Sequence, residues 1–362
     1  MFLLTLTSLI VFGFLILVHE FGHFIMAKRA GVRVEQFSLG FGPRLLSWKG
    51  SDTEYSICAI PLGGYVKLAG DNPEEFKGNS YEYLSKPVGQ RAKIIFFGPL
   101  LNYVMAFLCF WFVFFAGYPN LTCSVGELVE DFGAQEAGVK IGDKILAVDD
   151  KQVEVWQDLQ KIIHSKAEGQ VVKLSVLREG EEFKIPVRVK QETVDTIFGE
   201  KKSIGLIGIR PSDEIISIRY GPVKSFLMGA KSLFELTWLT LKSLAWIISG
   251  RISFRQSIAG PVEILFQIKQ ASDLGIIPLV HLTAILSMSL TIFNVLPIPV
   301  LDGGHLLLLL IEKIRGRRLS NRTEKFITDI GLSFLVLLVI FVFYNDLSRR
   351  GVFDNIYKWW SG

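Results

Sequence analysis

Cysteine and charge are both scarce in this chain of 362 residues. Its three cysteines, Cys58, Cys109 and Cys123, have the spacing of neither a zinc cluster nor a disulfide framework, and we interpret them as structural thiols. Charged residues make up 20% of the chain and hydrophobic residues 50%, with a mean hydropathy of +0.38. This composition is typical of a polytopic membrane protein with one soluble module. The net charge of +4 gives no indication of nucleic-acid binding.

The N-terminal part of the chain lacks charge altogether. No charged residue occurs between Met1 and Val18, so residues 2–27 are predicted to form a membrane helix. A cleaved signal peptide is disfavoured, because no lysine or arginine precedes the apolar run and no A-x-A cleavage motif follows it. Three further membrane spans are predicted at residues 94–116, 276–296 and 330–344, the last of them short for a full span.

Lysine and arginine are concentrated in two loops, one after the first predicted span and one between the third and the fourth. The positive-inside rule therefore predicts that both loops are cytoplasmic. The N-terminus, the long stretch after Tyr118 and the C-terminus would then lie outside, although Arg349 and Arg350 run against this orientation.

Strand-forming residues dominate two regions between the spans. Residues 37–68 are predicted to contain short strands at 55–57 and 63–68, which either offer an edge to an extended peptide or form a plain hairpin. Residues 122–211 are predicted to form a compact β-rich domain. Its expected strands are 124–129, 144–148, 171–178, 182–189 and 205–209, with a helix at 155–165.

Residues 226–248 are apolar but carry charges at helical spacing. We expect an amphipathic helix that lies on the membrane face, with a fifth span as the alternative.

The sequence His19-Glu20-Phe21-Gly22-His23 is an H-E-x-x-H box at the end of the first predicted span. The two histidines are four residues apart and share one helix face, and ionisable groups inside a membrane indicate function by default. His19 and His23 supply two zinc ligands, and Glu20 is the usual general base in this box.

A catalytic zinc site needs a third protein ligand. The best candidate lies in the segment 294–305, where Pro297 and Pro299 break the third span just before Asp302. Broken helices at membrane depth are tolerated where they line a cavity, which favours Asp302 as an oxygen ligand. His305 is the alternative third ligand.

These motifs together resemble the bacterial site-2 proteases of the regulator of sigma-E protease type. The resemblance rests on the H-E-x-x-H box and on the segment 294–304 with its Leu-Asp-Gly, and it is supported by the segments 98–102, 63–66 and 260–262. It implies a zinc intramembrane protease in which His19, His23 and Asp302 bind the metal. Asn102 and Asn294 would bind substrate or oxyanion, or else form helix-packing hydrogen bonds. Gly63, Gly64 and Tyr65 are further candidates for substrate binding.

Residues 134–148 resemble the corresponding stretch of bacterial PDZ domains, with Gly138 and Gly142 at turn positions. Some related proteases carry two PDZ domains, whereas the space here allows one. The resemblance implies either binding of an extended peptide end or simple exclusion of large substrates.

The sequence thus predicts a polytopic α-helical membrane protein of about four spans with an inserted extracytoplasmic PDZ domain. The expected regions are a membrane core at 1–118, the PDZ domain at 119–212, linker helices at 213–275 and a second membrane core at 276–362. We expect a zinc-dependent endopeptidase of the bacterial inner membrane. It would cleave transmembrane segments of single-span proteins, such as trimmed anti-sigma factors or remnant signal peptides.

The expected partners are these substrates, a peptide ligand of the PDZ domain and the lipid bilayer. From Leu3 to His19 a helix rises roughly 24 Å, which places the active site toward the cytoplasmic side. A PDZ-bearing scaffold and a zinc transporter are the alternative functions.

Overall fold

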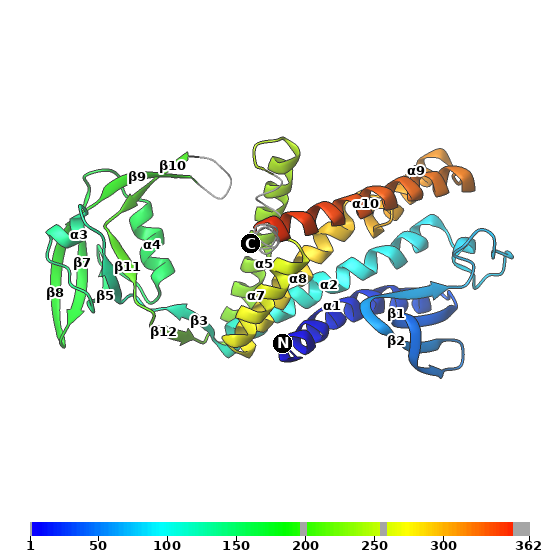
Figure 1. Cartoon of the computed structure of the whole chain (residues 1–362), viewed down its shortest axis with the longest axis horizontal. Helices are drawn as coiled ribbons and strands as arrows, with labels where there is room; N and C mark the ends of the chain where they lie inside the picture. Colours follow the sequence, from blue (N-terminus) through cyan, green and yellow to red (C-terminus); the bar gives the residue numbers. More distant parts are fainter. Residues whose placement is uncertain (1, 196–200, 254–258, 350–362) are drawn as a thin grey trace, which may run out of the picture. The chain divides into compact units, whose positions relative to one another are not determined.

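The computed structural model describes residues 2–195, 201–253 and 259–349 (Figure 1). The chain forms two compact units. The membrane unit comprises residues 1–113, 223–244 and 254–362, and the β-rich unit comprises residues 114–222 and 245–253.

Four helices of the described chain are long and apolar enough to cross a membrane, which confirms the predicted number of spans. They are α1 (Phe2–Arg29), α2 (Val88–Ala116), α8 (Ile276–Val295) and α10 (Asn321–Arg349). The last helix is much longer than the predicted 330–344, because its polar ends are helical too, and hydropathy detects only the apolar centre. Its apolar part is largely exposed, as a lipid-facing surface should be.

Three further helices of the described chain belong wholly or mainly to the membrane unit. They are α5 (Pro222–Ile248), α7 (Pro261–Asp273) and α9 (Asp302–Arg315). The helix predicted at 226–248 is present as α5, and it is not among the four candidate spans. Ser225, Gly229 and Leu233 form its buried face. Leu233 packs in a core with Phe110 of α2 and Met288 of α8.

A second core lies at the start of α1. Val11 and Leu15 of α1 pack there against Ile268 of α7, together with partly buried leucines of α8. The helices α1, α7 and α8 are therefore joined around the N-terminal half of the helix that carries the H-E-x-x-H box.

The loop between α1 and α2 contains a folded β-hairpin, β1 (Val34–Lys49) and β2 (Glu54–Leu68), followed by a short 3-10 helix at Tyr83–Ser85. Residues 34–39 pair with 64–68 and also with 54–57, while residues 44–49 pair with 54–58. Gly40 and Gly42 have φ angles of +88° and +85°, a backbone conformation that favours glycine and lets β1 fold over. The predicted strands 55–57 and 63–68 are thus parts of one longer strand.

The β-rich unit has a four-stranded sheet in the order β6-β5-β7-β8. These strands are β5 (Lys144–Val148), β6 (Lys151–Gln152), β7 (Val171–Arg178) and β8 (Glu181–Arg188). The helix α4 (Trp156–His164) buries Trp156, Leu159 and Ile163 in one core with the sheet. The predicted helix and the strands at 144–148, 171–178 and 182–189 are confirmed to within about a residue at their ends.

Six more strands of this unit form three pairs, together with a single helical turn, α3 (Gly133–Glu136). The pairs are β3 (Tyr118–Leu121) with β12 (Ile215–Ile218), β4 (Val125–Leu128) with β11 (Ile209–Pro211), and β9 (Lys190–Asp195) with β10 (Lys201–Leu206). The predicted strand 205–209 is wrong as a single strand. It is divided at Gly208, whose φ of +79° turns the chain and whose missing Cβ leaves room for Phe132.

Candidate metal centre

His19 and His23 lie on one face of α1, one helical turn apart. Their Nε2 atoms are 3.2 Å from each other, and the rings meet edge to face with centroids 4.8 Å apart. His19 is buried. The helix spacing alone therefore turns two ring nitrogens toward one point, as the sequence predicts.

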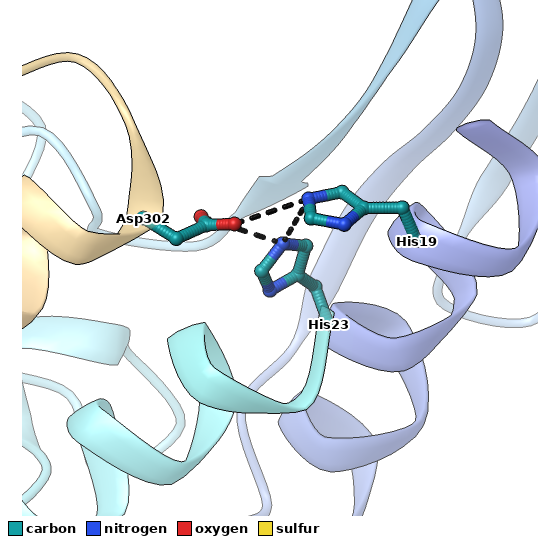
Figure 2. Close-up of side chains that lie close together, drawn as sticks. All are labelled: His19, His23 and Asp302. Carbon is teal, nitrogen blue, oxygen red and sulfur yellow. Dashed lines mark hydrogen bonds and ion pairs between the residues drawn. The ribbon is translucent and has the colours of Figure 1, made fainter. Parts of the chain in front are cut away.

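Asp302 completes a triangle with the two histidines (Figure 2). One of its carboxylate oxygens is 3.1 Å from His19 Nε2, and the other is 3.6 Å from His23 Nε2. In the described part of the chain, these three residues are the group of His, Cys, Asp or Glu side chains placed to hold a metal ion, with ligand atoms within 4.8 Å of one another. His305, the alternative third ligand, is not part of that group and lines the neighbouring cavity.

The break after α8 directs Asp302 toward α1. The helix ends at Val295, and α9 begins at Asp302. Between them Val300 has a φ of +82°, an unusual conformation for a β-branched residue. A side chain on Gly303 or Gly304 would overlap the backbone of residues 295–299, so these two glycines permit the tight turn.

His23 is oriented from behind by α2. Its Nδ1 lies 2.9 Å from the carbonyl oxygen of Ile94, which can only accept, so Nδ1 carries the proton and Nε2 keeps a free lone pair. The missing side chain of Gly98 leaves the space that the His23 ring fills, and Gly22 likewise has no room for a side chain against Phe97. The two glycines let α1 and α2 approach closely at the site.

His19 has an amide on each side. Asn102 of α2 is fully buried, with Nδ2 3.5 Å from His19 Nδ1, and its Oδ1 has no hydrogen-bond partner among the described residues. With the amide turned so that Oδ1 faces the ring, Asn102 would accept a hydrogen bond from His19 Nδ1–H. Asn294 of α8 lies on the other side, with Nδ2 3.4 Å from His19 Nε2.

These residues fit a zinc ion. Two imidazole Nε2 atoms and one carboxylate converge with unshielded lone pairs, which repel one another unless a cation lies between them. Two nitrogens and one oxygen form a donor set of the kind found in catalytic zinc sites. The hydrogen bond from His23 to a carbonyl, and the orphaned oxygen of Asn102 behind His19, match the outer partners that orient zinc-binding histidines.

Glu20 lines a cavity of about 640 Å³ together with His23 and Asp302. The strand β2 passes beside it, since a Cβ atom on Gly64 would lie 3.0 Å from Glu20 Cγ and 2.9 Å from the carbonyl oxygen of Ser38. Gly63 lies against the ring of Phe41, which stacks with Tyr65 at a centroid distance of 6.1 Å. The candidate substrate-binding residues of β2 therefore lie next to the candidate base.

The cavity extends away from the metal centre to polar residues of α2, α9 and the neighbouring loops. Arg91, Glu312, Arg318 and Asp71 line it there. Burial raises the pKa of the Asp71 carboxyl, even though this group accepts a hydrogen bond from Leu68 N–H. The cavity thus joins the metal centre to ionisable groups at one end of the membrane unit.

Sequence reasoning missed the roles of Ile94 and Gly98 at the site. The signal was present in the Gly98-Pro99 pair of the second span, but the residue that needed this space, His23, lies 75 positions earlier in the chain. No local pattern identifies a backbone carbonyl as a histidine acceptor.

A histidine pair, a neighbouring glutamate and an aspartate from a broken helix, within a unit of four candidate spans, define a membrane metalloprotease. The profile of peptidase family M50 matches residues 7–338, and the chain belongs to this family. Membership in a peptidase family favours an enzyme over the scaffold and transporter alternatives.

Named relatives align over nearly the whole chain. The regulator of sigma-E protease RseP of Escherichia coli is 30% identical and is covered to 99% of its length, with 96% of this chain aligned. The regulator of sigma-W protease RasP of Bacillus subtilis is 29% identical, with coverage of 94% of this chain and 97% of the relative. The zinc metalloprotease RasP of Geobacillus kaustophilus is 28% identical, with coverage of 95% and 97%.

The alignment with the Escherichia coli relative is 457 positions long, more than the 362 residues of this chain. That relative therefore contains sequence that this chain lacks. Among solved structures, the PDZ domain of an SdrC-like protein of Listeria innocua is similar to 26% of this chain and covers 96% of its own length, at 24% identity and a TM-score of 0.21.

Proposed function

We propose that this protein is a zinc-dependent intramembrane endopeptidase of the bacterial inner membrane that cleaves transmembrane segments of single-span proteins. The observation that carries the proposal is the triangle of His19, His23 and Asp302 beside Glu20. All of these side chains come from helices at or next to candidate spans. The proposal extends the family assignment to the metal, the substrate class and the residues that act.

A zinc ion held by His19, His23 and Asp302 would supply Lewis acidity that polarises the scissile carbonyl and acidifies a water molecule. Glu20 accepts a proton from the attacking water and then donates it to the leaving amine nitrogen. Asn102 holds the His19 ring from behind, where it is fully buried. Asn294 lies on the metal-facing side of His19 and is therefore placed to donate to the substrate carbonyl.

The strand β2 positions the substrate. A helical substrate hides its peptide carbonyls, so the cleaved segment must become extended. Residues 64–68 of β2 pair with residues 34–39 on one side, and Gly64 packs on Glu20. An extended substrate segment added along β2, with Gly63, Gly64 and Tyr65 beside it, would bring its backbone to the base.

The substrates proposed are trimmed anti-sigma factors or remnant signal peptides, since both leave a single span with a short outer end. The β-rich unit would act as an extracytoplasmic PDZ domain, which either binds a peptide end or excludes substrates with large outer domains. The basic loops before α2 and after α9 favour a cytoplasmic location for the end of α1 that carries the site.

The test compares purified wild type, Glu20→Gln and His19→Ala in detergent, with a single-span model substrate and with zinc quantified in each. Wild type should cleave and hold stoichiometric zinc. Glu20→Gln should keep its zinc and cleave about 10²- to 10⁴-fold more slowly, because it lacks the general base. His19→Ala should lose both. Normal cleavage by a zinc-replete Glu20→Gln would overturn the proposal.

A further inference from the structure

A buried ion pair lies in the wall of the cavity, away from the three candidate metal ligands. Arg91 of α2 is 4% exposed, and its guanidinium Nη2 is 2.6 Å from the Glu312 carboxylate of α9. Its Nε also donates to the carbonyl oxygen of Lys86, at 3.1 Å. A charge this buried requires its partner, because an unpaired ion inside a protein is strongly destabilising.

Both members of this pair stand on helices that hold the metal centre. Arg91 lies one helical turn before Ile94, whose carbonyl orients His23. Glu312 lies on α9, which begins at Asp302. The pair therefore connects the support of one candidate ligand to the helix that carries another.

The cavity separates α2 from α9 between these points. It is lined by Ile94 and Ile95 from α2 and by His305, Leu308 and Leu309 from α9. The Arg91–Glu312 contact is a direct side-chain link between the two helices, away from the end of α9 that carries Asp302.

We propose that Arg91 and Glu312 are positioning residues that set the spacing of α2 and α9, and through it the distance between His23 and Asp302. This inference rests on the proposed zinc centre and adds the residues that hold its two halves in register. The ion pair keeps α2 and α9 at a set distance on either side of a cavity that must stay open for water and peptide. Neither residue belongs to the group of candidate metal ligands.

Arg318 provides a matched control. Its Nε is 3.5 Å from the same Glu312 carboxylate, it donates to the carbonyl oxygen of Leu84, and its guanidinium lies 5.7 Å from the Phe76 ring centroid. Its side chain is 42% exposed, and it follows the end of α9. Removing Arg318 changes the charge beside Glu312 but leaves the link between α2 and α9.

The experiment measures the zinc dissociation constant of the purified full-length protein by competition with a chromogenic chelator. Arg91→Gln and Glu312→Gln should weaken zinc binding about 10- to 100-fold, as loss of outer-shell support does. Arg318→Gln should stay within a factor of about three, as expected for an exposed ion pair. The charge-exchanged double variant Arg91→Glu/Glu312→Arg should recover most of the affinity lost in either single variant.

A single variant with an unpaired buried charge can fail to fold, so an apolar pair supplies a second test. Arg91→Met/Glu312→Leu removes both charges together, which is often neutral for stability. This double variant should fold, with an unfolding temperature near that of wild type. Its zinc dissociation constant should nevertheless be at least about 10-fold higher than that of wild type. A folded apolar double variant with wild-type zinc affinity would overturn the inference.

Zinc titration of His19→Ala beside these variants separates this inference from the proposed function. If wild type binds no zinc, or if His19→Ala binds it as tightly as wild type, the proposed zinc centre itself is wrong. If wild type binds zinc, His19→Ala does not, and the Arg91 and Glu312 variants match wild type, the positioning role alone is wrong.

Discussion

The imidazole ring of His23 on α1 fills the space that a side chain on Gly98 of α2 would need. A side chain on Gly98 would overlap the imidazole ring of His23, and the same ring is fixed by a hydrogen bond to the carbonyl oxygen of Ile94, one turn earlier on α2. The absence of a side chain at Gly98 is thus a requirement of the metal centre.

Gly98→Ala should therefore displace His23 and weaken zinc binding at least about tenfold, in line with the loss of other outer-shell support. Gly89→Ala is the matched control, because Gly89 lies on the same helix with open space around it. Zinc titration of both variants checks the prediction. Equal affinity in the two would show that the His23 ring can be accommodated elsewhere.

Asn102 offers a second test of how the ligands are oriented. Asn102→Ala should weaken zinc binding about 10- to 100-fold, because His19 Nδ1 loses its buried partner. Asn102→Asp keeps an oxygen that accepts from Nδ1–H and should retain more of the affinity. If the alanine variant bound zinc as well as the aspartate variant, Asn102 would have no part in holding His19.

The position of β2 should affect the rate of substrate cleavage without changing the zinc content of the protein. A Cβ atom on Gly64 would lie 3.0 Å from Glu20 Cγ and from Ile16 Cγ2, so Gly64→Ala should push the strand away from the base. We expect kcat/KM to fall about 10- to 100-fold, as small misplacements of substrate do, with zinc content unchanged. Assays of cleavage and zinc on the same preparation check this, and reduced zinc would point to damage at the metal centre instead.

Asp346 of α10 caps the N-terminus of α7 through its carboxylate. Its carboxylate, 3% exposed, accepts hydrogen bonds from the backbone N–H groups of Gly260, Val262 and Glu263 at 3.0–3.2 Å. Asp346→Asn removes the charge and one acceptor, and should lower the free energy of unfolding by about 2–3 kcal/mol. Thermal unfolding in detergent measures this. Asp329→Asn, at an exposed position of the same helix, should change it little.

The pair of Asp143 and Arg178 should make the β-rich unit sensitive to acid. Burial by itself would raise the pKa of Asp143, but hydrogen bonds from Arg178 and from Lys140 N–H hold its pKa below the ordinary value of 3.8. The unfolded state therefore binds the proton first, and the stabilisation is complete above pH 3.8 and is lost as pH falls through the lower folded-state pKa.

Hydrogen exchange of β7 in the full-length protein should accordingly accelerate as the pH falls below 3.8, after correction for the intrinsic pH dependence. Asp143→Asn should cost about 2 kcal/mol at neutral pH, where the wild-type carboxylate is charged and bound to Arg178. The same variant should remove most of the acid sensitivity. A similar acid response in wild type and Asp143→Asn would assign it to other groups.

The sequence by itself determined the features that depend on short spacings. The interval of four between His19 and His23 places them on one face of α1, because a helix repeats every 3.6 residues. The absence of charge before Val18 marks a span, and the prolines at 297 and 299 end α8 before Asp302. Each of these signals lies within a single element, where backbone geometry relates position in the chain directly to position in space.

Only the tertiary structure decided which distant residues complete these elements. Asp302 and His305 are three residues apart, and the turn held by Gly303 and Gly304 directs Asp302 to the histidines. The links from Ile94 to His23 and from Arg91 to Glu312 join residues 71 and 221 positions apart. Such pairings depend on how helices pack, and packing is set by shape and burial summed over many side chains, which no local pattern of the chain records.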